Sequence, residues 1–109
     1  MAVTYMIQFD VKAGEIDRFH TLLGGVLDAM KHEPNFHEAR LLADPENPLR
    51  WMLYETWEDH QDVLEVQVHR PYRADWHAAL EAILAAPRAI SIWTPVRYDA
   101  GPGQTSNTR

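Results

Sequence analysis

The hydrophobic pattern of the chain changes period several times, and each period predicts one kind of element. Every second residue of residues 3–11 is apolar, with Met6 as an extra apolar residue, which is typical of a strand with one buried face. In residues 15–31 the apolar residues recur every three or four positions, and this spacing predicts a long amphipathic helix. The helix contains Gly24 and Gly25, which weaken it and usually indicate close approach of another backbone.

Two β-prone segments and a turn follow the predicted helix. Residues 36–43 predict a second strand and residues 51–57 a third, and the turn-rich residues 44–48 between them predict a hairpin. In the third strand Glu55 and Trp57 lie on one face, because strand side chains alternate. Asp59 then stands where the N-cap of a helix is expected.

The last part of the chain predicts an interrupted helix and one more strand. Residues 59–68 and 72–84 have helical patterns, and Arg70-Pro71 separates them because proline breaks the helical hydrogen-bond ladder. Residues 89–96 predict a final strand. The tail, residues 100–109, has the composition of a disordered segment.

The predicted order of elements is βαββαβ, the pattern of ferredoxin-like α+β folds, in which a four-stranded antiparallel sheet carries its helices on one face. Residues 1–99 are expected to form a single domain, because a chain of 109 residues with 46% hydrophobic content provides one small core. The opposite face of the sheet would expose bulky apolar side chains. We therefore expect two copies to pair sheet against sheet in a homodimer.

Composition and charge exclude several functions. The absence of cysteine excludes disulfides, thiolate nucleophiles and cysteine-ligated metal clusters. A formal net charge of −6 with scattered lysines and arginines disfavours nucleic acid as a partner. The N-terminus carries no basic-then-apolar leader, and no apolar run approaches the roughly 20 residues of a membrane span. We expect a cytoplasmic protein without a membrane partner.

Motifs for a bound metal or cofactor are also missing. The chain has no glycine-rich dinucleotide or phosphate loop. Residues 32–37 (HEPNFH) resemble the metalloprotease motif H-E-x-x-H, but the second histidine comes one residue late, and Pro34 prevents the helix that would align the two. We expect neither a metal site nor a cofactor, and two surface histidines in this turn.

Three segments together resemble the antibiotic biosynthesis monooxygenase family. They are FDVKAGEIDRF within residues 3–19, the hairpin DPENP that leads to YETWED within residues 41–65, and Pro71-Tyr72 followed by IWTPV at residues 92–96. The resemblance covers nearly the whole chain up to Tyr98 and implies a dimeric α+β barrel. Family members include quinol and anthrone monooxygenases that use molecular oxygen without metal or flavin, haem-degrading oxygenases, and proteins that process a signalling sugar. The haem-degrading members use an asparagine on the first strand, which this chain lacks.

The resemblance therefore implies a cofactor-independent monooxygenase that oxidises a quinol or a polycyclic phenol with molecular oxygen. The carbanion or enolate of such a substrate can itself reduce oxygen, so the protein must bind it, remove a proton and exclude water. Two alternatives stay open. One is an isomerase or lyase for a small polar metabolite, with a pocket lined by Gln8, Glu55, Gln67 and histidines. The other is a non-catalytic ligand-binding dimer in which aromatic residues fill the space between helices and sheet.

Aromatic walls and one base would suffice for the oxygenase chemistry. The resemblance supports Trp57 most directly as a catalytic residue, because family members carry tryptophan at this strand end. His69, just before the helix break, is the candidate base. The candidate substrate-binding residues are Tyr72, Trp76, Gln67, Glu55 and Phe9.

The position of the base depends on the register of one short segment. Similar family sequences carry a histidine in an L-E-x-H segment after the tryptophan, whereas here Gln67 follows Leu64-Glu65-Val66 and His69 comes two places later. If Gln67 occupies the family position, it would orient the substrate by hydrogen bonding and would not act as a base. His77 lies about two helical turns beyond His69 and is expected at the surface or at a pocket rim.

Overall fold

The computed structural model describes residues 1–103 and confirms the predicted order of elements. One antiparallel sheet is built from β1 (Val3–Asp10), β2 (Phe36–Asp44), β3 (Asn47–Trp57) and β4 (Ala89–Trp93). The strand order is β2-β3-β1-β4, so the first strand of the sequence lies inside the sheet. This topology is that of the predicted ferredoxin-like α+β fold.

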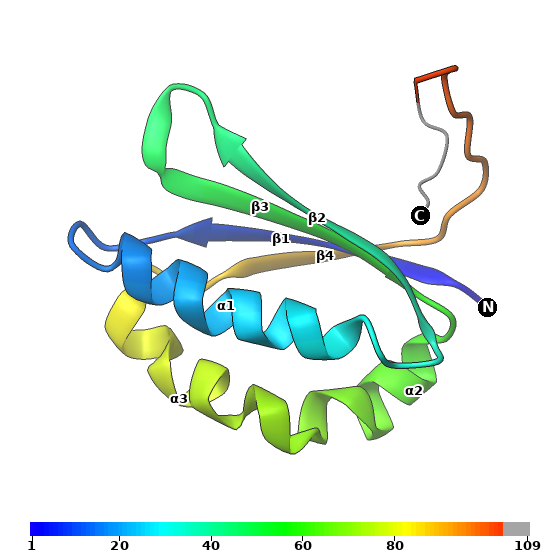
Figure 1. The fold of residues 1–109 in the computed structure, drawn as a ribbon, viewed down its shortest axis with the longest axis horizontal. Coiled ribbons are helices and arrows are strands. Elements are labelled where there is room, and N and C mark those ends of the chain that lie inside the picture. The colour runs from blue at the N-terminus through cyan, green and yellow to red at the C-terminus, as the bar shows by residue number, and fades with distance from the viewer. Residues whose placement is uncertain (104–109) are drawn as a thin grey trace.

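The helices cover one face of the sheet (Figure 1). α1 (Ile16–Met30) and α3 (Ala74–Ile83) lie next to each other, and the short α2 (His60–Glu65) follows β3. Two single turns, η1 (Gln67–His69) and η2 (Pro71–Arg73), connect α2 to α3. The predicted interruption at Arg70-Pro71 is present, since the proline nitrogen has no hydrogen to donate to the ladder. The helical segment predicted for residues 59–68 is shorter, because α2 ends at Glu65 and residues 67–69 form a separate single turn.

Two strands differ in length from the prediction. β3 begins at Asn47 and not at Trp51, because Asn47 pairs with Asp44 and the turn shrinks to the two residues between them. β4 ends at Trp93 and not at Val96. Pro95 follows the shortened strand, and proline cannot donate to a sheet ladder.

The prediction that another backbone approaches Gly24 and Gly25 is wrong. A Cβ atom added at either glycine would meet no atom within 4 Å outside the local helix backbone. Both glycines thus lower the stability of the helix, and no close packing within residues 1–103 requires a residue without a side chain at either position. Gly14 differs, because its φ of +89° lies in the left-handed region that glycine adopts without strain, and it helps the chain turn from β1 into α1.

The core lies between the sheet and the helices. The inner faces of β1 and β3 pack against α1 and α3, and the side chains buried between them include Tyr5, Ile7, Phe9, Leu53, Trp57, Phe19, Leu23, Met30, Trp76 and Ile83. The rings of Phe9, Phe19 and Trp76 contact one another, with centroids 5.2–5.9 Å apart. Aromatic packing therefore fills most of the space between the layers.

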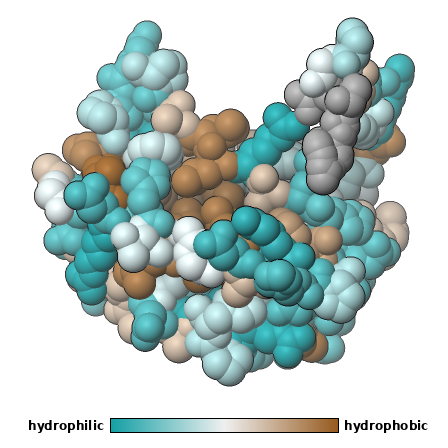
Figure 2. Space-filling model, viewed as in Figure 1, coloured by the Kyte–Doolittle hydropathy of each residue, from teal (hydrophilic) through white to brown (hydrophobic). Residues whose placement is uncertain are grey.

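The opposite face of the sheet carries apolar side chains that no helix covers. Met6, Leu42, Tyr54 and Trp93 alternate with the core residues and point to this face, and Leu42 and Trp93 are 48% and 59% exposed. Figure 2 shows hydrophobic residues gathered in a hollow over the sheet, between the β2–β3 hairpin and residues 94–103. The predicted apolar face is present.

The predicted tail, residues 100–109, lies mostly outside the described residues, since residues 104–109 are not described. Within residues 1–103, no helix combines the length and the apolar content that crossing a membrane requires.

Candidate active site

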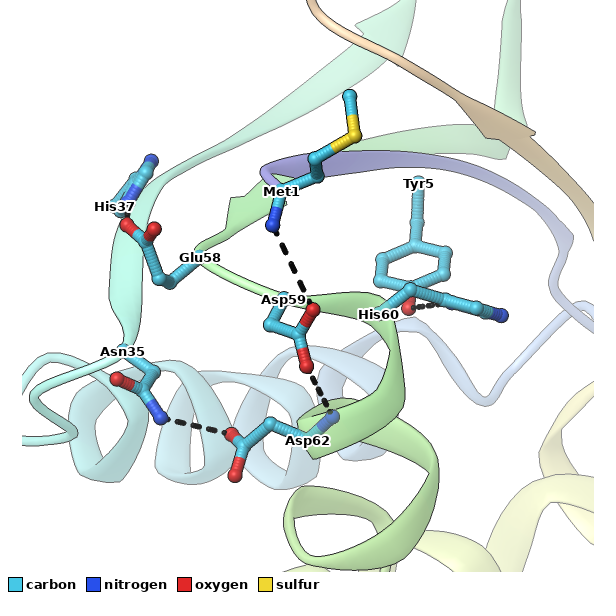
Figure 3. Close-up of polar contacts among 8 residues, drawn as sticks. All are labelled: Met1, Tyr5, Asn35, His37, Glu58, Asp59, His60 and Asp62. Atoms are coloured by element: carbon cyan, nitrogen blue, oxygen red, sulfur yellow. Dashed lines mark hydrogen bonds and ion pairs between the residues drawn. The ribbon is translucent and has the colours of Figure 1, made fainter.

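β3 ends at Trp57, and a group of polar contacts surrounds the start of α2 shortly after it (Figure 3). Asp59 has an extended backbone and accepts the amide hydrogen of Asp62 at 3.1 Å, which confirms the predicted N-cap. The carboxylate of Asp62 accepts the side-chain amides of Asn35 at 3.1 Å and Gln67 at 3.2 Å. These two hydrogen bonds hold the pKa of Asp62 below its usual range.

The same network decides where Gln67 and His69 point. Gln67 is 2% exposed, and its Oε1 atom is buried without a hydrogen-bond partner within residues 1–103. His69, two residues later on the same turn, is exposed. Of the two residues that compete for the family histidine position, Gln67 is the one turned inward. The catalytic role of His69 stays a prediction.

Trp57 and Glu55 form a buried pair on the inner face of β3. Trp57 is fully buried, and its Nε1 atom donates a hydrogen bond to Glu55 Oε1 at 3.0 Å. Burial raises the pKa of Glu55, whereas the bond from Trp57 and the charges of Arg73 and Arg88 oppose that rise. Such a carboxyl group ionises less readily than an exposed glutamate and is suited to accept a proton from a bound molecule.

On the neighbouring strand β1, Tyr5 is the residue paired with Glu55. Burial, together with the carboxylates of Glu55 and Asp59, raises the pKa of Tyr5 to about 12. The phenol is therefore protonated near neutral pH, and its oxygen is hydrogen-bonded to His60 Nδ1 at 2.6 Å (Figure 3).

Arg73 is a site residue that the sequence interpretation missed. It is 9% exposed, and its guanidinium carbon lies 5.8 Å from the ring centroid of Trp57 and 5.6 Å from that of Tyr72. Its Nε atom is buried and has no hydrogen-bond partner in the described part of the chain. The available signal was its spacing of three residues from Trp76, which puts both on one helix face.

These groups line a small, largely enclosed cavity between sheet and helices, here called the inner cavity. Its volume is about 30 Å³. The lining is formed by Ile7, Phe9, Leu23, Val26, Met30, Leu53, Glu55, Arg73, Trp76 and Arg88. Phe9, Glu55 and Trp76 were predicted site residues and meet here, and Trp57 joins them through its hydrogen bond to Glu55. The cavity is therefore lined by apolar side chains together with one carboxyl group and two guanidinium groups.

Tyr72, another predicted site residue, points elsewhere. Its hydroxyl donates to Glu33 Oε2 at 2.9 Å, and the same carboxylate forms an ion pair with Arg70 at 3.0 Å. Burial and the bond to Glu33 raise the pKa of Tyr72. Tyr72 thus connects the helix break to the end of α1 and is not part of the inner cavity lining.

A second, larger hollow lies beside α3 and the start of β4, here called the outer groove. Its volume is about 780 Å³, and its lining includes Lys12, His77, Leu80, Glu81, Leu84, Arg88 and Ile90. His77 is exposed at this groove, which agrees with the expected rim position. Partial burial lowers the pKa of His77, and the charges of Arg88 and Arg73 add to this effect. Arg88 lines both the outer groove and the inner cavity.

The histidines of the HEPNFH turn behave as surface residues. His32 and His37 are both exposed, and His37 Nε2 lies 2.8 Å from Glu58 Oε1 (Figure 3). Within residues 1–103, no three side chains of the His, Asp or Glu type lie close enough together to hold a metal ion.

Comparison with known proteins identifies the family. The model of the antibiotic biosynthesis monooxygenase family matches residues 2–79. The chain belongs to this family. A relative from Pestalotiopsis microspora, described as a "putative monooxygenase", is 27% identical over 94 residues, which are 85% of this chain and 78% of the relative.

Solved structures agree with the family in fold. Rv0793 of Mycobacterium tuberculosis superposes with a TM-score of 0.81 at 15% identity, covering 92% of this chain and 100% of its own. SnoaB, a cofactor-independent oxygenase from Streptomyces nogalater, gives a TM-score of 0.75 at 20% identity, covering 89% of this chain and 95% of its own. Both likenesses show the ferredoxin-like fold.

Proposed function

We propose that this protein is a cofactor-independent monooxygenase that oxidises a quinol or a polycyclic phenol with molecular oxygen. Membership of the monooxygenase family supports an oxygenase role. The observation that carries the proposal is the buried Glu55 carboxyl group, held by Trp57 at the wall of a cavity that aromatic side chains and two guanidinium groups also line. SnoaB, which shares the fold, is described as cofactor-independent.

The reaction balances with the substrate as the only electron donor. In a polycyclic phenol of the anthrone type, a CH₂ group in the ring next to the phenol loses a proton to Glu55, and the resulting carbanion passes one electron to oxygen. The substrate radical and superoxide combine into a peroxide, which takes the proton back from Glu55. Loss of water then leaves a carbonyl group, so one oxygen atom enters the product and the other leaves as water.

In this proposal the side chains have distinct tasks. Glu55 is the proton acceptor, because it is the carboxyl group that lines the inner cavity and its pKa is raised by burial. Trp57 orients that carboxyl group through its indole N–H. Phe9 and Trp76 form aromatic walls beside Glu55 and keep water from its carboxyl group. Gln67 and Tyr72 do not line the cavity and hold the chain between α2 and α3 in place through their bonds to Asp62 and Glu33.

The test is oxygen uptake by purified, chelator-treated protein with a panel of hydroquinones and anthrones, after subtraction of spontaneous oxidation. Glu55→Gln is expected to lower kcat by about 100-fold or more, because loss of a general base costs that much. Trp57→Phe is expected to lower turnover in the same assay. Absence of uptake above background with every substrate would refute the proposal.

The predicted base His69 is tested in the same experiment. Because His69 is exposed and outside the inner cavity lining, His69→Ala is expected to change turnover no more than the matched surface change His32→Ala. A loss of turnover confined to His69→Ala would make His69 the base, and Glu55 a residue that binds the substrate.

The alternative of an isomerase or lyase for a small polar metabolite is favoured by one observation. Glu55, Arg73 and Arg88 line the inner cavity, and a carboxyl group between guanidinium groups suits proton transfer on a polar metabolite. This enzyme would exchange a substrate proton with solvent without consuming oxygen. Solvent deuterium incorporation without oxygen uptake would therefore support the alternative.

We also propose that the protein acts as a homodimer through the uncovered face of its sheet. Met6, Leu42 and Tyr54 line a hollow on this face, and a contiguous exposed apolar surface usually marks an interface. Leu42→Asp is expected to shift the protein from dimer to monomer in sedimentation equilibrium, while Glu46→Gln at the exposed hairpin turn is not. A monomeric parent at micromolar concentration would contradict the dimer.

A further inference from the structure

Arg88 links two hollows that otherwise have separate walls. It lies just before β4, follows Pro87, and lines both the outer groove and the inner cavity. Partial burial lowers the pKa of Arg88, the charge of Arg73 adds to that effect, and the carboxylate of Glu55 opposes it. The three charged groups therefore interact across the inner cavity. Two guanidinium groups face one carboxyl group, so the cavity carries positive charge in a protein whose net charge is −6.

Arg73 contributes a donor that the described residues leave unused. Arg73 is 9% exposed and lines the inner cavity, and its buried Nε–H group has no acceptor within residues 1–103. Guanidinium nitrogen atoms are the donors that proteins use most often for carboxylate and phosphate oxygens. A buried unsatisfied donor is costly, and an anionic oxygen in the cavity would satisfy it.

The two hollows differ in volume and therefore suit different parts of one ligand. The inner cavity of about 30 Å³ accepts an oxygen atom or a group of similar size. The outer groove of about 780 Å³ lies within the range of small-molecule sites. Its walls are mainly apolar, with Leu80, Leu84 and Ile90 among them. The charged side chains of its lining are Lys12 and Arg88, which are positive, and Glu81, which is negative.

We propose that the outer groove and the inner cavity form one binding site for a flat apolar molecule that carries an oxyanion. The ring system lies in the outer groove, and the oxyanion lies between Arg88 and Arg73. The inference rests on the proposed function only where it identifies this oxyanion with the ionised phenol of the substrate. Arg88 and Arg73 then stabilise the negative charge that proton removal creates, and they select acidic phenols over neutral ring systems.

Titration calorimetry with two probes of the same shape tests the site. 2-Naphthoate carries an oxyanion on a flat ring system, and 2-naphthamide is its neutral counterpart. The parent protein is expected to bind the naphthoate at least about tenfold more tightly, as expected for one charge-assisted hydrogen bond. Equal affinities, or no heat with either probe up to millimolar concentration, would overturn the proposal.

The same calorimetric measurements on variants test whether the probes bind at the outer groove and the inner cavity. Arg88→Gln is expected to abolish the preference for naphthoate, and Arg88→Lys to retain part of it. The matched control is Arg50→Gln, since Arg50 is exposed and paired with Asp10 and Asp44 away from both hollows. Ala78→Trp, at an exposed position of the groove lining, is expected to weaken both probes about tenfold. Retention of the preference in Arg88→Gln, or unchanged binding in Ala78→Trp, would refute the site.

The binding assay tests the oxyanion site and the oxygen assay tests the proposed function, so either proposal can be refuted while the other stands. A parent that prefers naphthoate but consumes no oxygen with any quinol would refute the proposed function and leave the binding site in place. A parent that consumes oxygen but shows no preference between the probes would support the oxygenase and refute the oxyanion site.

Discussion

Replacing Trp57 by phenylalanine tests how the buried Glu55 carboxyl group is held. The change removes the Nε1–H that lies 3.0 Å from Glu55 Oε1, but it keeps an aromatic ring beside Phe36, whose centroid is 5.1 Å away. A hydrogen bond to a charged acceptor contributes about 1.5–3 kcal/mol. The smaller ring leaves a buried gap that costs about 1 kcal/mol more. We expect the free energy of unfolding to fall by about 2.5–4 kcal/mol.

Urea unfolding followed by circular dichroism at a fixed protein concentration measures this difference. The matched control is Trp51→Phe, because Trp51 donates its indole N–H to the neutral backbone oxygen of Pro48 in an exposed bond. That change is expected to cost about 1 kcal/mol. If Trp57→Phe costs no more than Trp51→Phe, the indole does not support the carboxyl group in the way described.

The pH dependence of the Trp57→Phe difference gives a second check. The hydrogen bond from Trp57 favours ionised Glu55 and so lowers the pKa of Glu55, against the rise that burial produces. Without that bond the pKa of Glu55 rises further, and ionisation destabilises the variant more than the parent. The stability gap between the two proteins is therefore expected to narrow as pH falls and Glu55 becomes protonated in both. A gap that stays constant with pH would refute the link to Glu55.

Three further changes have defined outcomes. Burial raises the folded pKa of Glu55 above its unfolded value of 4.5, so the stability of the parent relative to Glu55→Gln is highest below pH 4.5 and is lost as pH rises through the folded pKa. Urea unfolding across this pH range measures the stability difference, and a difference that does not change with pH would contradict the raised pKa. Gly24→Ala and Gly25→Ala should each add about 1 kcal/mol and raise Tm by about 4–8 °C, since an added Cβ meets nothing within 4 Å; a fall in Tm would mean that a neighbour does approach. Asp59→Ala should cost about 1 kcal/mol in thermal unfolding, whereas Asp59→Asn, which keeps an acceptor for the Asp62 amide, should cost less; equal losses would argue against the cap.

The sequence by itself determined the order and type of the elements. Alternation in residues 3–11 and helical spacing in residues 15–31 report directly which side of each segment is buried. Local chemistry also placed the N-cap at Asp59 and the interruption at Pro71, because both depend on residues only a few positions apart. The position of Trp57 at the strand end followed from the same local pattern. Element ends were less well determined, since the pairing of Asn47 with Asp44 depends on the partner strand.

Only the tertiary structure decided which side chains meet. Glu55, Arg73 and Arg88 come from β3, η2 and the approach to β4, and a period in the sequence cannot relate residues on separate elements. The choice between Gln67 and His69 was likewise undetermined, because the tight turn between α2 and Pro71 changes the direction in which successive side chains point. Sequence periodicity specifies a buried face, whereas the contacts across the core depend on the register and packing of the whole fold.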